Sequence, residues 1–117
     1  MNQPVKFDAI DLVDRLLGDE RLAKHVVESF LSDMPRQLSL LAESLNTEDA
    51  YNTRMNAHSI KGAAANAGAT GVCRTAGQLE HLGLEGKLPE AKKLLPELAA
   101  EMESVSAALQ SFCDSVR

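Results

Sequence analysis

The sequence predicts an all-α protein, an antiparallel four-helix bundle with a short additional N-terminal helix. Aromatic residues make up only 3% of the 117 residues and tryptophan is absent. The core must therefore consist mainly of leucine, valine, alanine and methionine, a composition that suits helices better than sheets. Apolar residues recur with the 3.6-residue period of a helix, and no segment shows the alternation of a strand. Short turns separate these segments, as in a helical bundle.

The first two helices are predicted on either side of Gly18. Asp8 caps a short helix, Phe7 packs down just before it, and Gly18 ends it. Asp19 begins a long second helix that Pro35 bends without ending, because the apolar pattern continues beyond the proline. The residues expected to face the core are Ile10, Leu12, Val13, Leu16 and Leu17 in the first helix, and Leu22, Val26, Val27, Phe30, Leu31, Leu38, Leu40, Leu41 and Leu45 in the second.

The third helix carries the most informative stretch of the chain. Asn46 or Thr47 is predicted to cap it, with Glu48 and Asp49 in the first turn, where acidic side chains suit the helix dipole. Gly68 is predicted to end it. The whole chain, residues 1–117, is expected to form one domain, with a loose segment at residues 1–6.

Two more helices follow. The fourth is predicted to open at Thr70 or Gly71 and to stop at Gly83 and Gly86. The last takes Pro89 in its first turn, where the missing amide proton costs nothing. The residues expected to face the core are Val72, Ala76, Leu79 and Leu82 in the fourth helix, and Leu94, Leu95, Leu98, Met102, Val105, Leu109 and Phe112 in the last.

Residues 56–69 read NAHSIKGAAANAGA. On a helix, one side of this stretch is a stripe of small apolar residues with the spacing of a buried face. That stripe consists of Ala57, Ile60, Ala64 and Ala67. His58, Gly62 and Ala65 point away from the stripe, with Lys61 on its flank. The sequence thus predicts an outward-facing histidine with a cation one turn along and almost no side-chain bulk nearby.

These residue types suit phosphoryl chemistry. A neutral imidazole is a nucleophile near neutral pH, and Lys61 could balance charge on a transferring phosphoryl group. Gly62 costs roughly 1 kcal/mol of helix stability against alanine, which makes sense if a partner must approach the backbone closely. The alternative is a surface histidine beside an unrelated lysine and glycine. The combination of His58, Lys61 and Gly62 opposite an alanine stripe argues against that alternative.

In this stretch the chain resembles the histidine-containing phosphotransfer (HPt) domains of bacterial two-component phosphorelays. Their mark is a helix with His-x-x-Lys-Gly, small residues and a Gly-Ala turn, here His58, Lys61, Gly62 and then Gly68-Ala69. The run of residues 7–35 is also similar to the opening of many HPt domains, so the resemblance covers about residues 7–109. It implies that His58 is the phosphorylated residue.

The resemblance also implies partners. His58 would take a phosphoryl group from the aspartate of a receiver domain and pass it to another receiver. The sequence shows neither an acidic triad for magnesium nor a glycine-rich phosphate loop, so no cofactor is expected on this chain and Mg²⁺ is expected on the receiver. The chain is better described as a phosphocarrier than as an enzyme. A hybrid sensor histidine kinase is a further candidate partner, and the protein is expected to be a monomer.

Four residues near His58 are candidates for a docking surface. Met55 and Tyr51 fall on the outward side, one and two turns before it respectively. Arg54 flanks them, and Ala65 follows His58. Bulky apolar residues on an outward face often mark a binding surface. The alternative is that Tyr51 and Met55 pack against the segment around Pro35 or are scattered surface residues.

Two residues of the next helix are candidates to orient the imidazole, namely Glu80 and Gln78. The spacing of related HPt domains puts a glutamine or glutamate at Glu80, where an acceptor would fix the tautomer of the ring. An ordinary solvated carboxylate is the alternative. His25 and His81 have no evident partners and are expected to be surface residues. The three histidines lack the spacing of a metal site.

The remaining features exclude several classes of protein. The net charge of −5 argues against nucleic acid as a partner. No stretch is apolar enough to span a membrane, so a cytoplasmic protein is expected. Cys73 and Cys113 are read as reduced structural residues. Two alternatives remain for the function and context: a four-helix adaptor that binds a receiver without accepting phosphate, or one domain of a larger hybrid sensor kinase.

Overall fold

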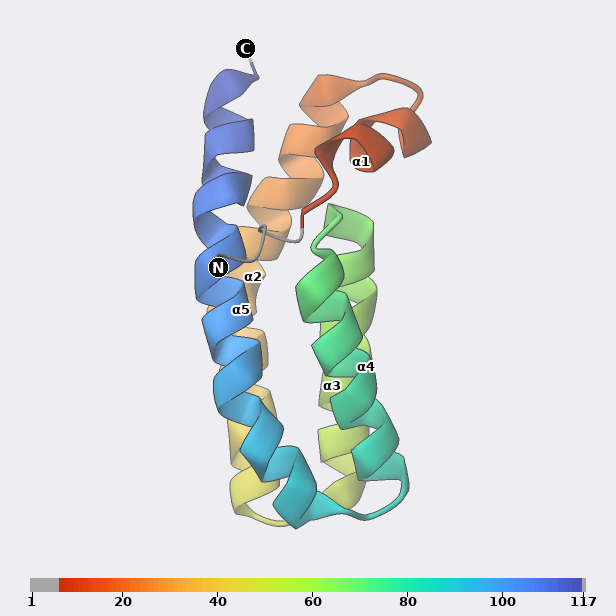
Figure 1. Ribbon diagram of the computed structural model, residues 1–117, viewed down its shortest axis with the longest axis vertical. Coiled ribbons are helices and arrows are strands. Elements are labelled where there is room, and N and C mark those ends of the chain that lie inside the picture. The colour runs from red at the N-terminus through yellow and green to blue at the C-terminus, as the bar shows by residue number, and fades with distance from the viewer. Residues whose placement is uncertain (1–6, 117) are drawn as a thin grey trace, which may run out of the picture.

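The computed structural model describes residues 7–116, which form five helices (Figure 1). They are α1 (Ala9–Arg15), α2 (Glu20–Asn46), α3 (Ala50–Ala67), α4 (Thr70–Leu84) and α5 (Leu88–Ser115). Successive helices from α2 to α5 run antiparallel, and each of these four packs against two of the others, with α3 between α2 and α4. The predicted four-helix bundle with a short N-terminal helix is confirmed. The loose segment expected at residues 1–6 lies outside the described residues.

The short helix α1 covers one end of the bundle. Helices α2 and α5 have 27 and 28 residues, whereas α3 and α4 have 18 and 15. At the end of the bundle where α3 ends and α4 begins, α1 lies across the longer helices (Figure 1). Its Leu12 is buried, and Phe7 packs edge-on against Phe112 of α5 with ring centroids 5.8 Å apart. This packing buries apolar surface that the longer helices would otherwise expose.

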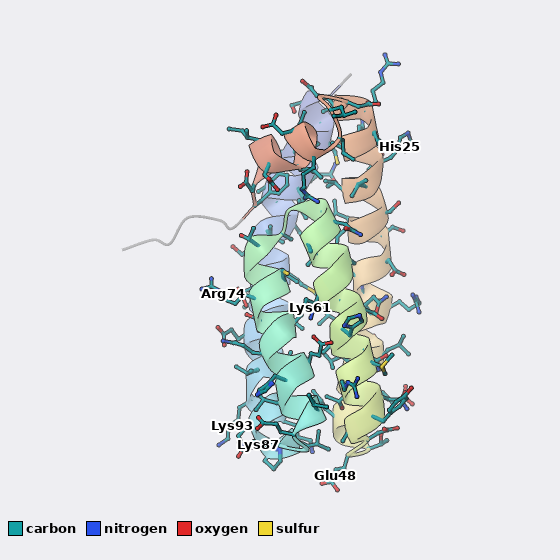
Figure 2. The ribbon with its side chains drawn as sticks, turned by 90° about the vertical axis from the view of Figure 1, so that its right-hand side faces the viewer. His25, Glu48, Lys61, Arg74, Lys87 and Lys93 are labelled. Atoms are coloured by element: carbon teal, nitrogen blue, oxygen red, sulfur yellow. The ribbon has the colours of Figure 1, made fainter. Side chains whose placement is uncertain are left out.

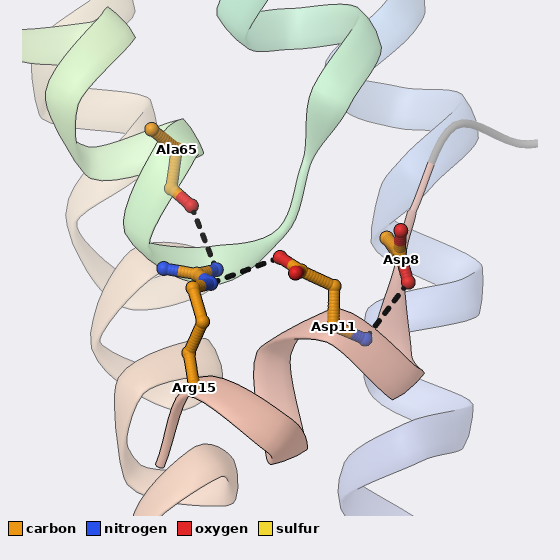
Figure 3. Close-up of polar contacts among 4 residues, drawn as sticks. All are labelled: Asp8, Asp11, Arg15 and Ala65. Atoms are coloured by element: carbon orange, nitrogen blue, oxygen red, sulfur yellow. Dashed lines mark hydrogen bonds and ion pairs between the residues drawn. The ribbon is translucent and has the colours of Figure 1, made fainter.

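Polar contacts fix α1 to the end of α3. Asp8 caps α1 as predicted, because its side chain accepts from the amide of Asp11 at 2.9 Å. The amide of Asp8 in turn donates to the carbonyl of Gly68, where a φ of 74° favours glycine. Arg15 pairs with Asp11 and donates from Nη2 to the carbonyl of Ala65 at 3.1 Å (Figure 3). Because Ala65 lies on the His58 side of α3, α1 borders that side.

Most of the predicted core residues are buried or half-buried, but four leucine and isoleucine assignments are wrong. The exposed residues are Ile10, Leu17, Leu22 and Leu40. Helix α1 has only seven residues and one buried side, so Ile10 is 78% exposed, while Leu17 follows the helix in the turn and is 97% exposed. In α2 the fully buried Ala23 takes the core position next to Leu22. The 3.6-residue period therefore predicts which side of each helix is buried, but not which residues at the margin of that side are exposed.

The cap predicted for α3 is also wrong. Helix α2 continues to Asn46, and the hydroxyl of Thr47 donates back to the carbonyl of Glu43 at 3.0 Å, so Thr47 finishes α2. Glu48 follows with a φ of 55°. Asp49 caps α3 instead, because its side chain accepts from the amide of Asn52. The predicted start of α2 at Asp19 and the predicted end of α3 at Gly68 are confirmed.

Proline and glycine have different roles in the longer helices. Helix α2 runs through Pro35 without interruption, as predicted, whereas the bend at this proline stays a prediction. Pro89 lies in the first turn of α5, as expected. Gly83 lies in the last turn of α4, at the end predicted for this helix, but it is helical and buried, and the helix ends one residue later at Leu84. The turn comes at Gly86, which has a φ of 73°.

Candidate functional site

His58 stands on the outward side of α3. The four small residues of the predicted stripe, Ala57, Ile60, Ala64 and Ala67, are all fully buried against the rest of the bundle. Facing the other way, the side chain of His58 is 60% exposed, and Gly62 and Ala65 are exposed on the same side. The alanine stripe therefore anchors α3 so that the histidine is held at the surface by a rigid helix.

Glu80 of α4 joins His58 to Lys61. Its Oε2 atom lies 2.5 Å from Nδ1 of His58, and its Oε1 atom accepts a hydrogen bond from Nζ of Lys61. Figure 2 shows Lys61 pointing from α3 toward α4. One turn separates the two donors on α3, so a single carboxylate facing them can accept from both. The structure thus brings Glu80, one of the two predicted orienting residues, to the imidazole.

The charges of this cluster fix where the imidazole carries its proton. The hydrogen bond from Lys61 lowers the pKa of Glu80; burial partly opposes this, and the contact with His58 lowers the pKa further. Glu80 is therefore ionised near neutral pH and can only accept. In a neutral imidazole facing that carboxylate, Nδ1 carries the hydrogen and Nε2 keeps its lone pair. The nitrogen with the lone pair is the one turned away from Glu80.

The surroundings of His58 leave room for another molecule. A Cβ atom added at Gly62 would have no neighbour within 4 Å, so this position opens to solvent. Tyr51 and Met55 are 65% and 38% exposed, and Arg54 and Ala65 are exposed as well. All four lie on the exposed side of α3 that carries His58, in the places where the sequence predicted them.

The other candidates lie elsewhere. Gln78 is exposed on a different side of α4, where it lines a shallow pocket with Leu94 of α5, so the structure does not bring it to His58. His25 is exposed on α2, far along the bundle from Lys61 (Figure 2). His81 is exposed too, but Glu85 lies 3.1 Å from its Nε2, a partner that the sequence analysis did not name.

Two residues near the site were not anticipated. Arg15 reaches the carbonyl of Ala65 from α1 (Figure 3), and the only sequence signal was Asp11 one turn before it. Gly83 packs against the backbone of Arg54. Nothing in the sequence separates a glycine at a helix crossing from a glycine that ends a helix, so its role depends on the packing of α3 against α4.

Residues 7–116 include no group of three or more histidine, cysteine, aspartate or glutamate side chains arranged to hold a metal ion. Within the same part of the chain, no helix has both the length and the apolar character that crossing a membrane requires. Cys73 and Cys113 are both free thiols, and burial raises the pKa of Cys113.

Comparison with known proteins agrees with this fold. The model of the Hpt domain family matches residues 25–108, a range that includes α3 and α4 entirely. The chain therefore belongs to the Hpt domain family. It is 28% identical over 107 residues to the phosphorelay intermediate protein rdeA of Dictyostelium discoideum, covering 92% of this chain and 42% of that protein. The chain thus spans less than half the length of this curated relative.

The fold is similar to a solved structure as well. The crystal structure of histidine-containing phosphotransfer protein B (HptB) from Pseudomonas aeruginosa matches with a TM-score of 0.88. The match covers 98% of this chain and 100% of the other, at 24% sequence identity. This likeness extends the agreement in fold to the whole bundle, including the short α1.

Proposed function

We propose that this chain is a phosphorelay carrier, in which His58 takes a phosphoryl group from a receiver-domain aspartate and passes it to another receiver aspartate. The observation that carries the proposal is the exposed imidazole whose Nδ1 faces Glu80 at 2.5 Å, with Lys61 on the same carboxylate. Membership of the Hpt domain family and the likeness to a phosphorelay intermediate protein support it.

The transfer needs only one bond made and one broken. The lone pair on Nε2 of His58 attacks the phosphorus of the aspartyl phosphate; the N–P bond forms as the P–O bond to the aspartate breaks, and the aspartate leaves as a carboxylate. The proton on Nδ1 stays in place, and the ring gains positive charge. Ionised Glu80 stabilises that charge at Nδ1, because it is already positioned as an acceptor. The reverse sequence hands the phosphoryl group to the next receiver.

Lys61 and Gly62 complete the proposed site. Lys61 adds a cation that can stabilise negative charge on the phosphoryl oxygens. Gly62 lets the receiver backbone approach α3, and Tyr51, Arg54, Met55 and Ala65 would form the docking surface with it. In this proposal the receiver supplies Mg²⁺ and its acidic ligands. A hybrid sensor kinase is a further candidate partner, and the carrier acts as a cytoplasmic monomer.

Labelling by a small set of phosphorylated receiver domains tests the proposal. Wild-type protein should gain label that is lost in acid and kept in base, as a phosphoramidate requires. His58→Gln should gain none while keeping its helical content, because the side chain points to solvent. His25→Gln and His81→Gln are the matched controls and should be labelled normally. Label that survives His58→Gln would refute the assignment, and receiver binding without any label would favour the adaptor function.

A further inference from the structure

Helices α3 and α4 touch backbone to backbone at one glycine. Gly83 of α4 is buried against Arg54 of α3. A Cβ atom added at Gly83 would lie 2.9 Å from the backbone nitrogen of Arg54 and 3.1 Å from its Cα. Backbone atoms cannot rotate out of the way as the end of a flexible side chain can. Any side chain at Gly83 must therefore push α4 away from α3.

This contact lies one turn from the imidazole site on both helices. Gly83 follows Glu80 by three residues on α4, and Arg54 precedes His58 by four on α3, so each pair shares a helix side. The Glu80 carboxylate spans the same gap between the helices to reach His58 and Lys61. Because the reach of a glutamate side chain is limited, the separation of α3 and α4 at this level decides whether the Glu80 carboxylate reaches both donors.

We propose that Gly83 is a positioning residue for phosphoryl transfer, an inference that rests on the proposed function of His58. Gly83 touches neither a substrate nor the imidazole. It sets the separation at which Glu80 holds the proton on Nδ1 of His58, which leaves Nε2 free to attack. If α4 moves away, the 2.5 Å contact between His58 and Glu80 lengthens, and hydrogen bonds weaken beyond about 3.2 Å. The ring then loses the partner that selects its tautomer.

A second glycine on the same helix provides a matched control. A Cβ atom at Gly77 would meet only Cδ of Lys61, at 3.5 Å, which is ordinary contact with a flexible side chain. Gly77→Ala therefore adds the same methyl group to α4 without forcing the helices apart. Leu109→Val, in the buried side of α5, is a second control that lowers stability away from the site.

The ring ¹⁵N chemical shifts of His58, measured by NMR at about pH 8 where an ordinary imidazole is neutral, report the tautomer directly. Wild type, Gly77→Ala and Leu109→Val should carry the hydrogen on Nδ1. Gly83→Ala should show a mixture that includes the Nε2–H form. Its rate of phosphoryl uptake from a phospho-receiver should fall roughly tenfold, since small misplacements of a reacting group have effects of this order. A wild-type tautomer and rate in Gly83→Ala would overturn the inference.

A mutant cycle shows whether Gly83 acts through Glu80. In a Glu80→Gln background, Gly83→Ala should change the uptake rate by less than about twofold, because coupled residues are not additive. Fully additive losses would contradict the proposed route. If Gly83→Ala does not fold, Glu80→Asp decides, since it withdraws the carboxylate by one methylene and leaves the helix contact intact. An unchanged tautomer and rate in Glu80→Asp would overturn the inference.

These outcomes are distinct from a failure of the proposed function. If His58 is not a phosphoacceptor, either wild-type protein takes no label from any receiver or the label survives His58→Gln, whatever the tautomer of the ring. If only the role of Gly83 is wrong, wild-type protein is labelled and Gly83→Ala is labelled equally fast.

Discussion

Oε2 of Glu80 lies 2.5 Å from Nδ1 of His58, although 22 residues separate them in the chain. The same carboxylate accepts from Lys61. Lys61 is thus already engaged before any phosphoryl group arrives, and its ammonium has two uses. It lowers the pKa of Glu80, the carboxylate that faces the imidazole, and it is a cation one turn from His58 on the same helix.

Replacing Lys61 should slow phosphoryl uptake without abolishing it. Lys61→Ala removes both a cation near the transferring group and the main cause of the lowered pKa of Glu80. We expect the rate from a phospho-receiver to fall roughly tenfold, less than for a fully buried donor because the side chain is partly exposed. Lys93→Ala, the same change far along the bundle on α5 (Figure 2), should have no effect. Equal rates for the two variants would remove Lys61 from the mechanism.

Gly62 should lower the stability of α3 while leaving room for a receiver domain beside His58. No atom lies within 4 Å of a Cβ added there, so Gly62→Ala should raise the free energy of unfolding by about 0.5–1 kcal/mol in urea melts. Gly62→Gln should slow transfer from a phospho-receiver by covering the exposed surface beside His58. The internal control is phosphoramidate, a small donor, which should still label His58 in Gly62→Gln. Normal transfer from the receiver in this variant would refute the close-approach argument.

The exposed Tyr51 and Met55 should contribute to receiver binding. Tyr51→Glu and Met55→Glu each add a charge to an apolar surface that would lose its water when a receiver binds. We expect each to weaken receiver binding by about tenfold, corresponding to about 1.4 kcal/mol, with the helical content unchanged. Ala99→Glu on the exposed side of α5 controls for the added charge. Unchanged affinity in both variants would show that the receiver docks elsewhere.

Stability at acid pH should depend on Glu80. Its pKa is lowered in the folded protein, so the unfolded chain binds protons more readily as the pH falls. The contribution of Glu80 to stability is therefore present above pH 4.5, the ordinary glutamate pKa, and is lost as the pH falls through the lower, folded-state value. The difference in unfolding free energy between wild type and Glu80→Gln should shrink over this range in urea melts. A difference that stays constant would contradict the ion pair.

Asp33 and Asp49 also have lowered pKa values, from hydrogen bonds with Gln37 and Arg36 in one case and with Asn52 in the other. Both residues are present in wild type and in Glu80→Gln. Their effects on acid stability therefore cancel in the difference between the two proteins, which isolates the contribution of Glu80.

The sequence by itself determined the five helices, the buried alanine stripe of α3 and the outward position of His58. These follow from local physics, because a 3.6-residue period assigns each side chain to a face before any partner helix is known. Lys61 and Gly62 were found for the same reason, since they lie within one turn of His58 on the same helix.

Tertiary structure alone decided which residues of the other helices reach the site. Gln78 and Glu80 were both candidates, and the spacing of related HPt domains favoured Glu80. The rotation of α4 about its axis turns Glu80, and not Gln78, toward His58. The sequence indicated only that Gly83 lies near the end of a helix. Its packing on the backbone of Arg54 is visible only in the tertiary structure. The rotation of a helix about its axis and its distance from a neighbouring helix depend on how two whole helix surfaces pack. A local sequence pattern therefore does not predict either of them.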